Sequence, residues 1–300
     1  MFQVLAHNIL PIFSMLALGY LLGLTRKVSR EEASAINRVA FLVLQPALIF
    51  PLINGLSLAE FQFGAIALYA ACQATLFCVT FGIAHFILKR DRLESWLLAM
   101  ATIFVNTLLY IWPISYLIYG EAAALPITSI VALDTAFTFA FFIVTTDLMA
   151  NRQATALTSL KRVATNPVLI AIALGVVTNI LNVAVPVPLL TAMDFAGAAA
   201  PPLTLFALGV ILSGHPLTPT PTIVTISTLK LLVFPAMLWA ALHLGDRPPE
   251  WNTLMVLAAA GPAGAMSFAL AMLHGERTDQ IAPVNDWTYV LSILSLARLA

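Results

Sequence analysis

Long runs of apolar residues, separated by short polar or Pro- and Gly-containing connections, make up almost the whole chain. A helix needs about 20 apolar residues to cross a bilayer, and most of the runs reach that length. The pattern therefore predicts ten membrane helices and leaves no room for a soluble domain. The runs are 5–24, 34–53, 63–88, 96–119, 125–149, 167–185, 189–212, 221–244, 253–273 and 284–300.

The composition supports this all-α integral membrane class. Hydrophobic residues make up 61% of the 300 residues and charged residues only 9%, with a mean hydropathy of +0.96. Soluble proteins carry roughly 25% charged residues. The 14 basic and 14 acidic residues balance, which argues against nucleic acid as a partner. Cys72 and Cys78 share one apolar run and indicate neither a disulfide framework nor a metal site.

Basic residues are distributed unevenly between the connections. Connections 25–33, 88–95 and 150–166 each hold three Lys or Arg, whereas 54–62 and 120–124 hold none. Positively charged connections stay in the cytoplasm. We therefore expect a multi-pass membrane protein with both termini outside the cytoplasm.

The two halves of the chain resemble each other at an offset of about 156 residues. Pro11 and Gly19 in the first run recur as Pro167 and Gly175 in the sixth. Five helices per unit is an odd number, so the units must be inverted relative to each other in the membrane. The predicted organisation is a first repeat at 1–149, a cytoplasmic linker at 150–166 and an inverted repeat at 167–300.

Two runs are interrupted at corresponding places. Pro113 removes a backbone hydrogen bond in the fourth run, which also carries Asn106 and Thr107, and Gly261–Gly264 with Pro262 interrupts the ninth. Broken backbone survives in a membrane only where protein or a water-filled cavity covers it. The repeat offset sets Asn106 opposite Pro262, so both interruptions are predicted to share one cavity, where the N-termini of the following half-helices favour an anion.

Asn106 and Thr107 are polar residues in an otherwise apolar helix. They either tie neighbouring helices together, at about 0.6–2 kcal/mol per hydrogen bond, or contact a substrate. The nearby proline favours a substrate site. Gly261 and Gly264 either permit close helix packing or let the backbone approach a partner or ligand.

Charged residues within predicted spans include Asp134, Asp147, Asp194 and Lys230. Asp147 and Asp194 lie near helix ends and are interpreted as structural, whereas Asp134 and Lys230 lie deeper. Three interpretations of the deeper two stay open: a structural ion pair, a proton-coupling site, or helix faces that reach water. No metal-binding histidine spacing, Walker motif or nucleophile elbow occurs, so no cofactor, metal or enzyme activity is predicted, and His274 is interpreted as interfacial.

Several motifs in order resemble the auxin efflux carrier family of membrane transporters, over nearly the whole chain. These are Asn37-Arg38-Val39-Ala40 with Gln45-Pro46-Ala47-Leu48, Asn106-Thr107-Leu108 with Pro113, Asn166-Pro167, Pro202 with Leu208-Gly209, and Ala260-Gly261-Pro262. Tyr110 and Ile111 stand where relatives often have a small residue, and Ser267 replaces a proline common in plant members. Auxin itself is therefore not the expected substrate, and the short linker suits a bacterial member.

The resemblance implies ten helices in two inverted bundles, with broken fourth and ninth helices crossing at mid-membrane, and elevator-like transport of a small organic anion such as a mono- or dicarboxylate. Transport is expected to be driven by a gradient of H⁺ or Na⁺ or by the substrate's own gradient, and a homodimer is compatible with the pattern. The likeness to bacterial members implies the bacterial inner membrane as the location. The expected substrate-binding residues are Asn106, Thr107, Pro113, Gly261, Pro262, Gly264, Gln45 and Pro46, and the ion-coupling candidates are Asp134 and Lys230.

Three alternatives remain. A sodium and bile-acid type symporter would need a cluster of oxygen ligands, for which Gln45, Asn106 and Thr107 are the available residues. An intramembrane enzyme would need a catalytic pair, and only Asp134 with Lys230 qualifies. A sensor without transport would differ from both in showing no uptake into proteoliposomes.

Overall fold

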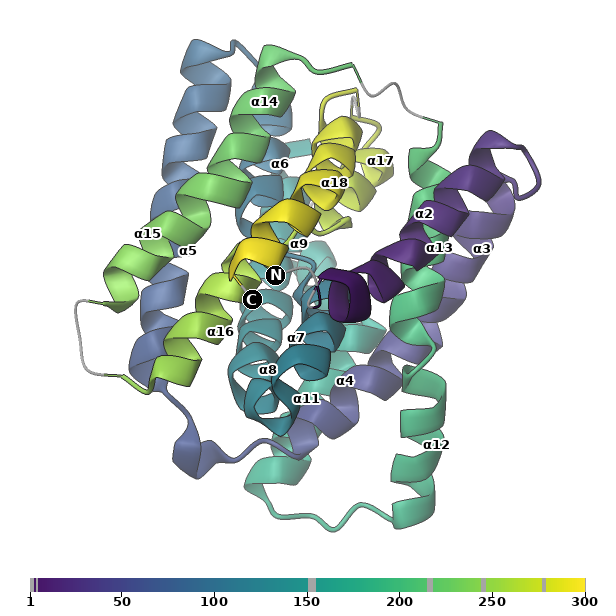
Figure 1. Ribbon diagram of the computed structural model, residues 1–300, viewed down its shortest axis with the longest axis vertical. Coiled ribbons are helices and arrows are strands. Elements are labelled where there is room, and N and C mark those ends of the chain that lie inside the picture. The colour runs from purple at the N-terminus through teal and green to yellow at the C-terminus, as the bar shows by residue number, and fades with distance from the viewer. Residues whose placement is uncertain are drawn as a thin grey trace.

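The computed structural model describes residues 3, 5–150, 155–214, 218–243, 247–276 and 279–299, and it has no β-strand in these ranges (Figure 1). Residues 151–154 of the predicted linker, including Arg152, lie outside the described residues. The protein is an assembly of helices, many of which contain one π-helical turn. These turns and the short 3₁₀ segments are labelled η.

The first half contains η1 (Leu5–Ile9), α2 (Leu10–Leu24), α3 (Arg30–Val39), η2 (Ala40–Leu44), α4 (Gln45–Asn54), η3 (Leu58–Glu60), α5 (Phe63–Gly82), η4 (Ile83–Ile87), α6 (Arg92–Ile103), η5 (Thr107–Ile111), α7 (Trp112–Tyr119), η6 (Gly120–Ala123), α8 (Ala124–Leu133), η7 (Asp134–Phe139) and α9 (Ala140–Ala150). Helices α3 and α6 start about four residues before the apolar runs predict, because a polar first turn is capped. Ser29 and Glu32 form a capping box on α3, and Asp91 accepts from the N–H groups of Leu93 and Glu94 on α6.

The second half contains α10 (Ala156–Ala164), α11 (Pro167–Ile180), α12 (Val187–Gly197), α13 (Ala200–Leu212), α14 (Pro221–Thr228), η8 (Leu229–Val233), α15 (Phe234–Leu242), α16 (Pro249–Ala259), α17 (Met266–Leu273) and α18 (Ile281–Leu299). The described part of the predicted linker thus forms a helix, α10, which meets α11 at a bend of 67°. Asn166 caps α11 by accepting from Val168 and Leu169 N–H.

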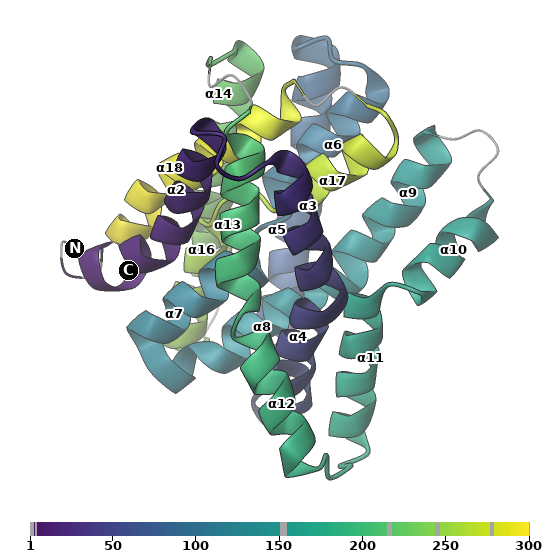
Figure 2. The same cartoon turned by 90° about the vertical axis from the view of Figure 1, so that its right-hand side faces the viewer.

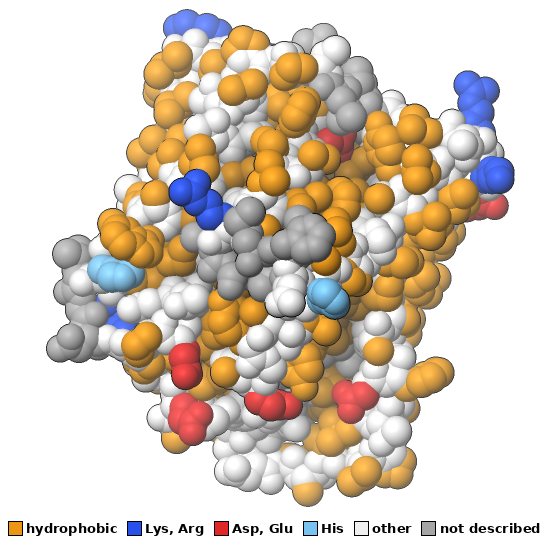
Figure 3. Space-filling model, in the orientation of Figure 1, with side chains coloured by type: hydrophobic (Ala, Val, Ile, Leu, Met, Phe, Trp, Pro, Cys, Tyr) orange, Lys and Arg blue, Asp and Glu red, His pale blue; other side chains and the backbone are white. Residues whose placement is uncertain are grey.

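Six helices among the described residues are long and apolar enough to cross a membrane by themselves, or seven if the bent α10–α11 pair counts as one span. The fourth and ninth apolar runs are interrupted at 104–106 and 260–265. Figure 3 shows hydrophobic side chains over most of one face, with charged side chains mostly near its upper and lower ends. Large apolar side chains such as Phe195, which is 87% exposed, fit a lipid environment.

Glycines allow two pairs of helices to touch along their backbones. A Cβ on Gly19 of α2 would lie 2.0 Å from Phe206 O on α13, and one on Gly175 of α11 would lie 3.2 Å from Phe50 O on α4. Figure 2 shows α2 beside α13 and α4 beside α11. Gly175 and Phe206 lie 156 residues after Gly19 and Phe50, so these two contacts correspond to each other at the offset found in the sequence.

The first interruption lies before the residues that were predicted to cause it. Residues 104–106 break the helix, whereas Pro113 lies inside the helix that follows, directly after the π-helical turn η5. The N–H of Trp112 donates to Thr107 O, and the helix continues through Pro113 with one backbone hydrogen bond fewer. The second interruption, at 260–265, does contain the predicted Gly-Pro-Ala-Gly segment.

Candidate functional site

The two interruptions lie against each other and pair through their backbones. Val105 and Ala263 form an isolated antiparallel bridge. Asn106 N–H donates to Pro262 O at 3.0 Å, and Gly264 N–H donates to Phe104 O at 2.8 Å. Each broken helix therefore satisfies part of its backbone with the other one. The two residues aligned by the repeat offset, Asn106 and Pro262, are direct hydrogen-bond partners.

Gly261 and Gly264 make this close approach possible. A Cβ on Gly261 would lie 2.5 Å from Ile111 Cδ1 and 2.9 Å from Val105 Cγ1, and one on Gly264 would lie 2.6 Å from Phe104 Cδ1. All of these neighbours belong to the other interrupted helix. Both glycines therefore act at the contact between the two breaks.

Two long polar side chains cap the carbonyl ends of the helices that stop at the breaks. Gln73 Nε2 on α5 donates to Ile103 O, the last residue of α6, at 3.2 Å. Lys230 Nζ on η8 donates to Ala259 O, the last residue of α16, at 3.0 Å. A cation near the negative end of a helix is favourable. Lys230 is fully buried and its Nζ also lies 4.8 Å from the Phe234 ring centroid.

Asp134 lies next to the first of these caps, in the π-helical turn η7. Its Oδ1 accepts from Gln73 Nε2 at 2.6 Å and from Thr138 Oγ1 at 3.5 Å, while Oδ2 has no hydrogen-bond partner among the described residues. Among the described residues, Asp134 and Lys230 do not form an ion pair, for which the N and O atoms would have to lie within 4.0 Å of each other. Gln73 thus links Asp134 to the break, and Lys230 is engaged with the other one.

The half-helices that follow the breaks begin with free N–H groups. Tyr110 and Ile111 N–H both donate to Asn106 O, so the N–H groups of Thr107 and Leu108 precede the hydrogen-bonded turn. On α17 the first N–H group that donates to a backbone carbonyl four residues earlier is that of Ala269, which donates to Ala265 O. The N–H groups of Met266 and Ser267 therefore lie at the free end of the helix. The N-terminus of a helix carries about half a positive charge and binds anions.

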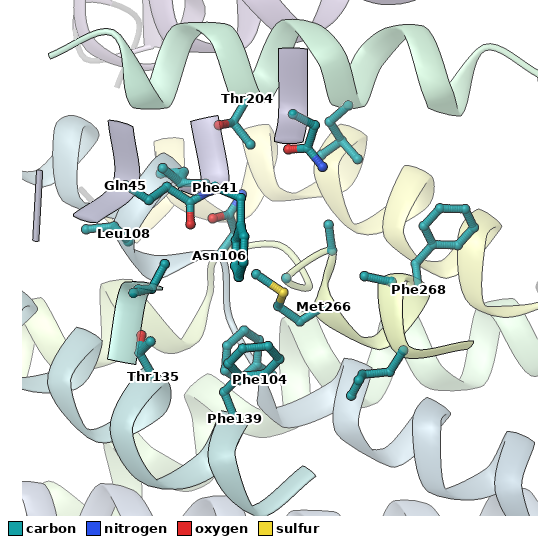
Figure 4. A pocket seen from close by; sticks show the side chains of 18 of the residues that line it. Phe41, Gln45, Phe104, Asn106, Leu108, Thr135, Phe139, Thr204, Met266 and Phe268 are labelled. Carbon is teal, nitrogen blue, oxygen red and sulfur yellow. The ribbon is translucent and has the colours of Figure 1, made fainter. Parts of the chain in front are cut away.

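These ends face one cavity of about 690 Å³, within the range of small-molecule sites. Figure 4 shows Asn106 and Met266 near its middle, with Phe41, Phe104 and Phe139 among the aromatic side chains around them. The polar lining residues are Ser34, Asn37, Arg38, Gln45, Asn106, Thr107, Asp134, Thr135, Arg162, Asn166 and Thr204. The buried hydroxyls of Thr107 and Thr204 have no partner in the part of the chain that the structure describes, as expected where a ligand supplies one.

The structure divides the residues predicted for the site into two sets. Gln45, Asn106, Thr107, Gly264 and Asp134 line the cavity. Gly261 and Pro262 lie in the contact between the breaks, outside the lining. The remaining predicted residues, Pro46, Pro113 and Lys230, lie in the first turn of α4, in the first turn of α7 and in η8, also outside the lining.

Helix α18 contributes residues that the sequence analysis did not single out. Tyr289 Oη accepts from Asn106 Nδ2, and Thr288 Oγ1 accepts from Ala263 N–H at 3.1 Å. Ser295 Oγ donates to Ala260 O at 3.2 Å. Polar residues at helical spacing in a predicted span were the available signal, but only the fold shows that this face covers the breaks.

A second polar cluster lies at the end of α17. Asp147, which is 4% exposed, accepts from Arg162 Nη1 at 2.5 Å, and its Oδ1 lies 2.9 Å from His274 Nε2. The side chains of Asp147, Arg162 and His274 thus join α9, α10 and the end of α17. Asp194 is exposed on α12.

Comparison with known proteins gives the class, a membrane transporter. A family profile described as membrane transport protein matches residues 4–299. The chain belongs to this family, the auxin efflux carrier family that its motifs indicate.

Two relatives cover almost the full length. The chain is 28% identical over 302 residues to a Rhizobium meliloti (strain 1021) protein named "Putative malonate transporter", covering 97% of this chain and 93% of the relative. It is 25% identical over 295 residues to an "Uncharacterized transporter" of Methanothermobacter thermautotrophicus, covering 97% of this chain and 95% of that protein.

Proposed function

We propose that this membrane transporter is a secondary carrier for a small organic anion such as a mono- or dicarboxylate, which binds beside the paired breaks. The observation that carries the proposal is the convergence of two half-helix N-termini, Asn106 and two unpartnered threonine hydroxyls on one cavity. Such a site stabilises a carboxylate without a lysine at its centre. The name of the Rhizobium relative points to the same class of substrate.

The architecture that goes with this function is ten membrane helices in two inverted repeats, 1–149 and 167–300, joined by the linker 150–166. The corresponding contacts of Gly19 with Phe206 and of Gly175 with Phe50 support the repeat. The Asn106–Pro262 pair does so as well, because residues on a two-fold axis meet their own equivalents. An elevator-like movement of the crossing helices against the remaining bundle would alternate the access of the cavity.

Orientation in the membrane is a further part of the proposal. The connection from α2 to α3, the connection from α5 to α6 and the end of α9 lie toward the upper end of the molecule in Figure 2, and these are the basic connections. We place this end in the cytoplasm. In a variant without cysteine, a Cys at exposed Thr158 should react with an impermeant maleimide only after lysis, and one at exposed Ala122 should react in intact cells. The reverse pattern would invert the proposed topology.

The central test of the function is uptake of labelled mono- and dicarboxylates into proteoliposomes. Asn106→Ala removes one hydrogen bond to a charged ligand, worth about 1.5–3 kcal/mol. Affinity should fall roughly 10- to 150-fold. Since Asn106 also donates to Tyr289, Tyr289→Phe serves as the control for that contact. Wild-type affinity in Asn106→Ala, or no uptake of any carboxylate by the wild-type protein, would contradict the proposed site.

Coupling to protons through Asp134 is the version of the mechanism that the cavity favours. The Asp134 carboxylate lines the same cavity as the proposed anion, and two like charges in a desolvated site repel each other. A proton on Asp134 removes this repulsion, so anion and proton would bind together. Asp134→Asn should then keep exchange of substrate but lose the stimulation of uptake by an imposed pH gradient, while a normal response to the gradient would exclude this role. Uptake that instead requires Na⁺ would favour the symporter alternative.

A further inference from the structure

Two arginines line the cavity at a distance from the breaks. Arg38 comes from α3 and Arg162 from α10, segments that are far apart in the sequence. The sequence analysis counts Arg162 among the basic residues of the linker and Arg38 among the residues of a family motif, and it assigns neither to the site. Their presence in the lining indicates a role in the cavity.

Helix geometry places both arginines about two turns from the breaks. Arg38 precedes Gln45 by seven residues on the continuous α3–η2–α4 helix, which is about 10 Å along the axis at 1.5 Å per residue. Figure 4 shows Gln45 close to Asn106. Helix α17 runs from Met266 at the break to His274, about 12 Å by the same rise, and His274 shares Asp147 with Arg162. Both arginines contribute to the lining of the cavity at that level.

The charges around this end of the cavity leave a positive excess. Arg38 has no hydrogen bond or ion pair with the described residues. Arg162 uses Nη1 for Asp147, and its side chain is still 49% exposed. A guanidinium has five N–H donors, so one bound edge leaves the other free for a second carboxylate. The acidic residue among those that line the cavity, Asp134, is turned toward Gln73 and Thr138.

We propose that Arg38 and Arg162 bind the second carboxylate of a dicarboxylate whose first carboxylate lies at the breaks, and that they set the preference for dicarboxylates over monocarboxylates. Asp147 fixes one edge of Arg162 and so orients the other edge toward the cavity. This inference rests on the proposed function, since it needs an anion at the breaks. It adds the residues that recognise the far end of the substrate.

The test compares binding of malonate, succinate and glutarate with that of propionate, butyrate and monomethyl succinate, by calorimetry on the purified full-length protein. Arg38→Gln should lower dicarboxylate affinity by about 10-fold or more, because a charge-assisted contact is lost. Monocarboxylate affinity should stay within about 2-fold, since these ligands lack the second charge. Arg92→Gln is the matched control, because exposed Arg92 on α6 does not line the cavity.

Arg162 requires a gentler change, because removing its charge would leave Asp147 buried without its partner. Arg162→Lys keeps the charge but loses the planar fork that binds a carboxylate through two N–H groups. It should also reduce the preference for dicarboxylates while leaving the melting temperature close to that of the wild type. Equal losses for both ligand classes, or none in either variant, would overturn this inference.

The outcomes separate this inference from the proposed function. If Asn106→Ala weakens both ligand classes but Arg38→Gln and Arg162→Lys change neither, the anion site at the breaks stands and the arginines have no role in substrate recognition. If the wild-type protein binds none of the six compounds, both proposals fail together.

Discussion

The two breaks differ in how their sequences produce them. The second, at 260–265, contains Gly261, Pro262 and Gly264, residues that interrupt a helix locally. The first, at 104–106, consists of Phe, Val and Asn and has neither glycine nor proline. Its backbone is extended because it pairs with the second break. One break is thus determined by local sequence and the other by its tertiary partner.

The side chains that cap the two breaks occupy equivalent positions in the two halves but differ in their chemical groups. Ile103 and Ala259, the capped residues, are separated by 156 positions, and Gln73 and Lys230, the capping residues, by 157. The first half uses a neutral amide that also holds Asp134, whereas the second uses a cation. Residues at equivalent positions therefore donate to the last carbonyl before each break, and only the cap in the first half also binds a carboxylate.

Of the substitutions that test this comparison of the two caps, Lys230→Ala should have the largest effect on stability. It leaves the carbonyl of Ala259 without its buried donor and creates a cavity, at a cost of about 2–5 kcal/mol in the free energy of unfolding. Lys230→Gln, which copies the amide of the first half, should recover a large part of the lost stability. The measurement is thermal unfolding in detergent. Equal melting temperatures for Lys230→Ala and the wild type would show that the cap is unimportant.

Gln73→Ala should have a smaller effect on stability but a distinct effect on transport. Losing the donor to Ile103 O costs about 1–3 kcal/mol, and Asp134 loses its hydrogen bond as well. We therefore expect altered pH dependence of uptake in Gln73→Ala. Thr75→Ala, on the exposed face of the same helix, is the control. Identical pH profiles for Gln73→Ala and this control would separate Gln73 from Asp134.

The smallest effect is expected at Pro113. Because the helix continues through Pro113 and the break lies at 104–106, Pro113→Ala removes no hydrogen bond and should leave transport nearly intact, with a melting temperature no lower than that of the wild type. Pro262→Ala should reduce uptake more, since Pro262 stiffens the segment whose carbonyl binds Asn106 N–H. Uptake assays on the two variants decide the point. A greater loss of uptake in Pro113→Ala than in Pro262→Ala would support the position of the first break that the sequence alone predicts.

The sequence by itself determined the class of the protein, the family and the position of the second break. Apolar runs, low charge and the order of Pro and Gly motifs are local properties of the chain, and their effects do not depend on tertiary contacts. The repeat offset also brought Asn106 opposite Pro262, which are hydrogen-bonded in the structure.

Only the tertiary structure decided the first break, the role of Lys230 and the extent of the cavity. An extended segment such as 104–106 depends on hydrogen bonds from a chain more than 150 residues away. In a membrane, the usual partner of a buried lysine is an acidic residue. Lys230 instead donates to the carbonyl of Ala259, which the second break leaves without an intrahelical partner. Arg38 and Arg162 line the cavity from two separate helices, and Tyr289 contacts Asn106 from a third. No spacing along the chain encodes these distances.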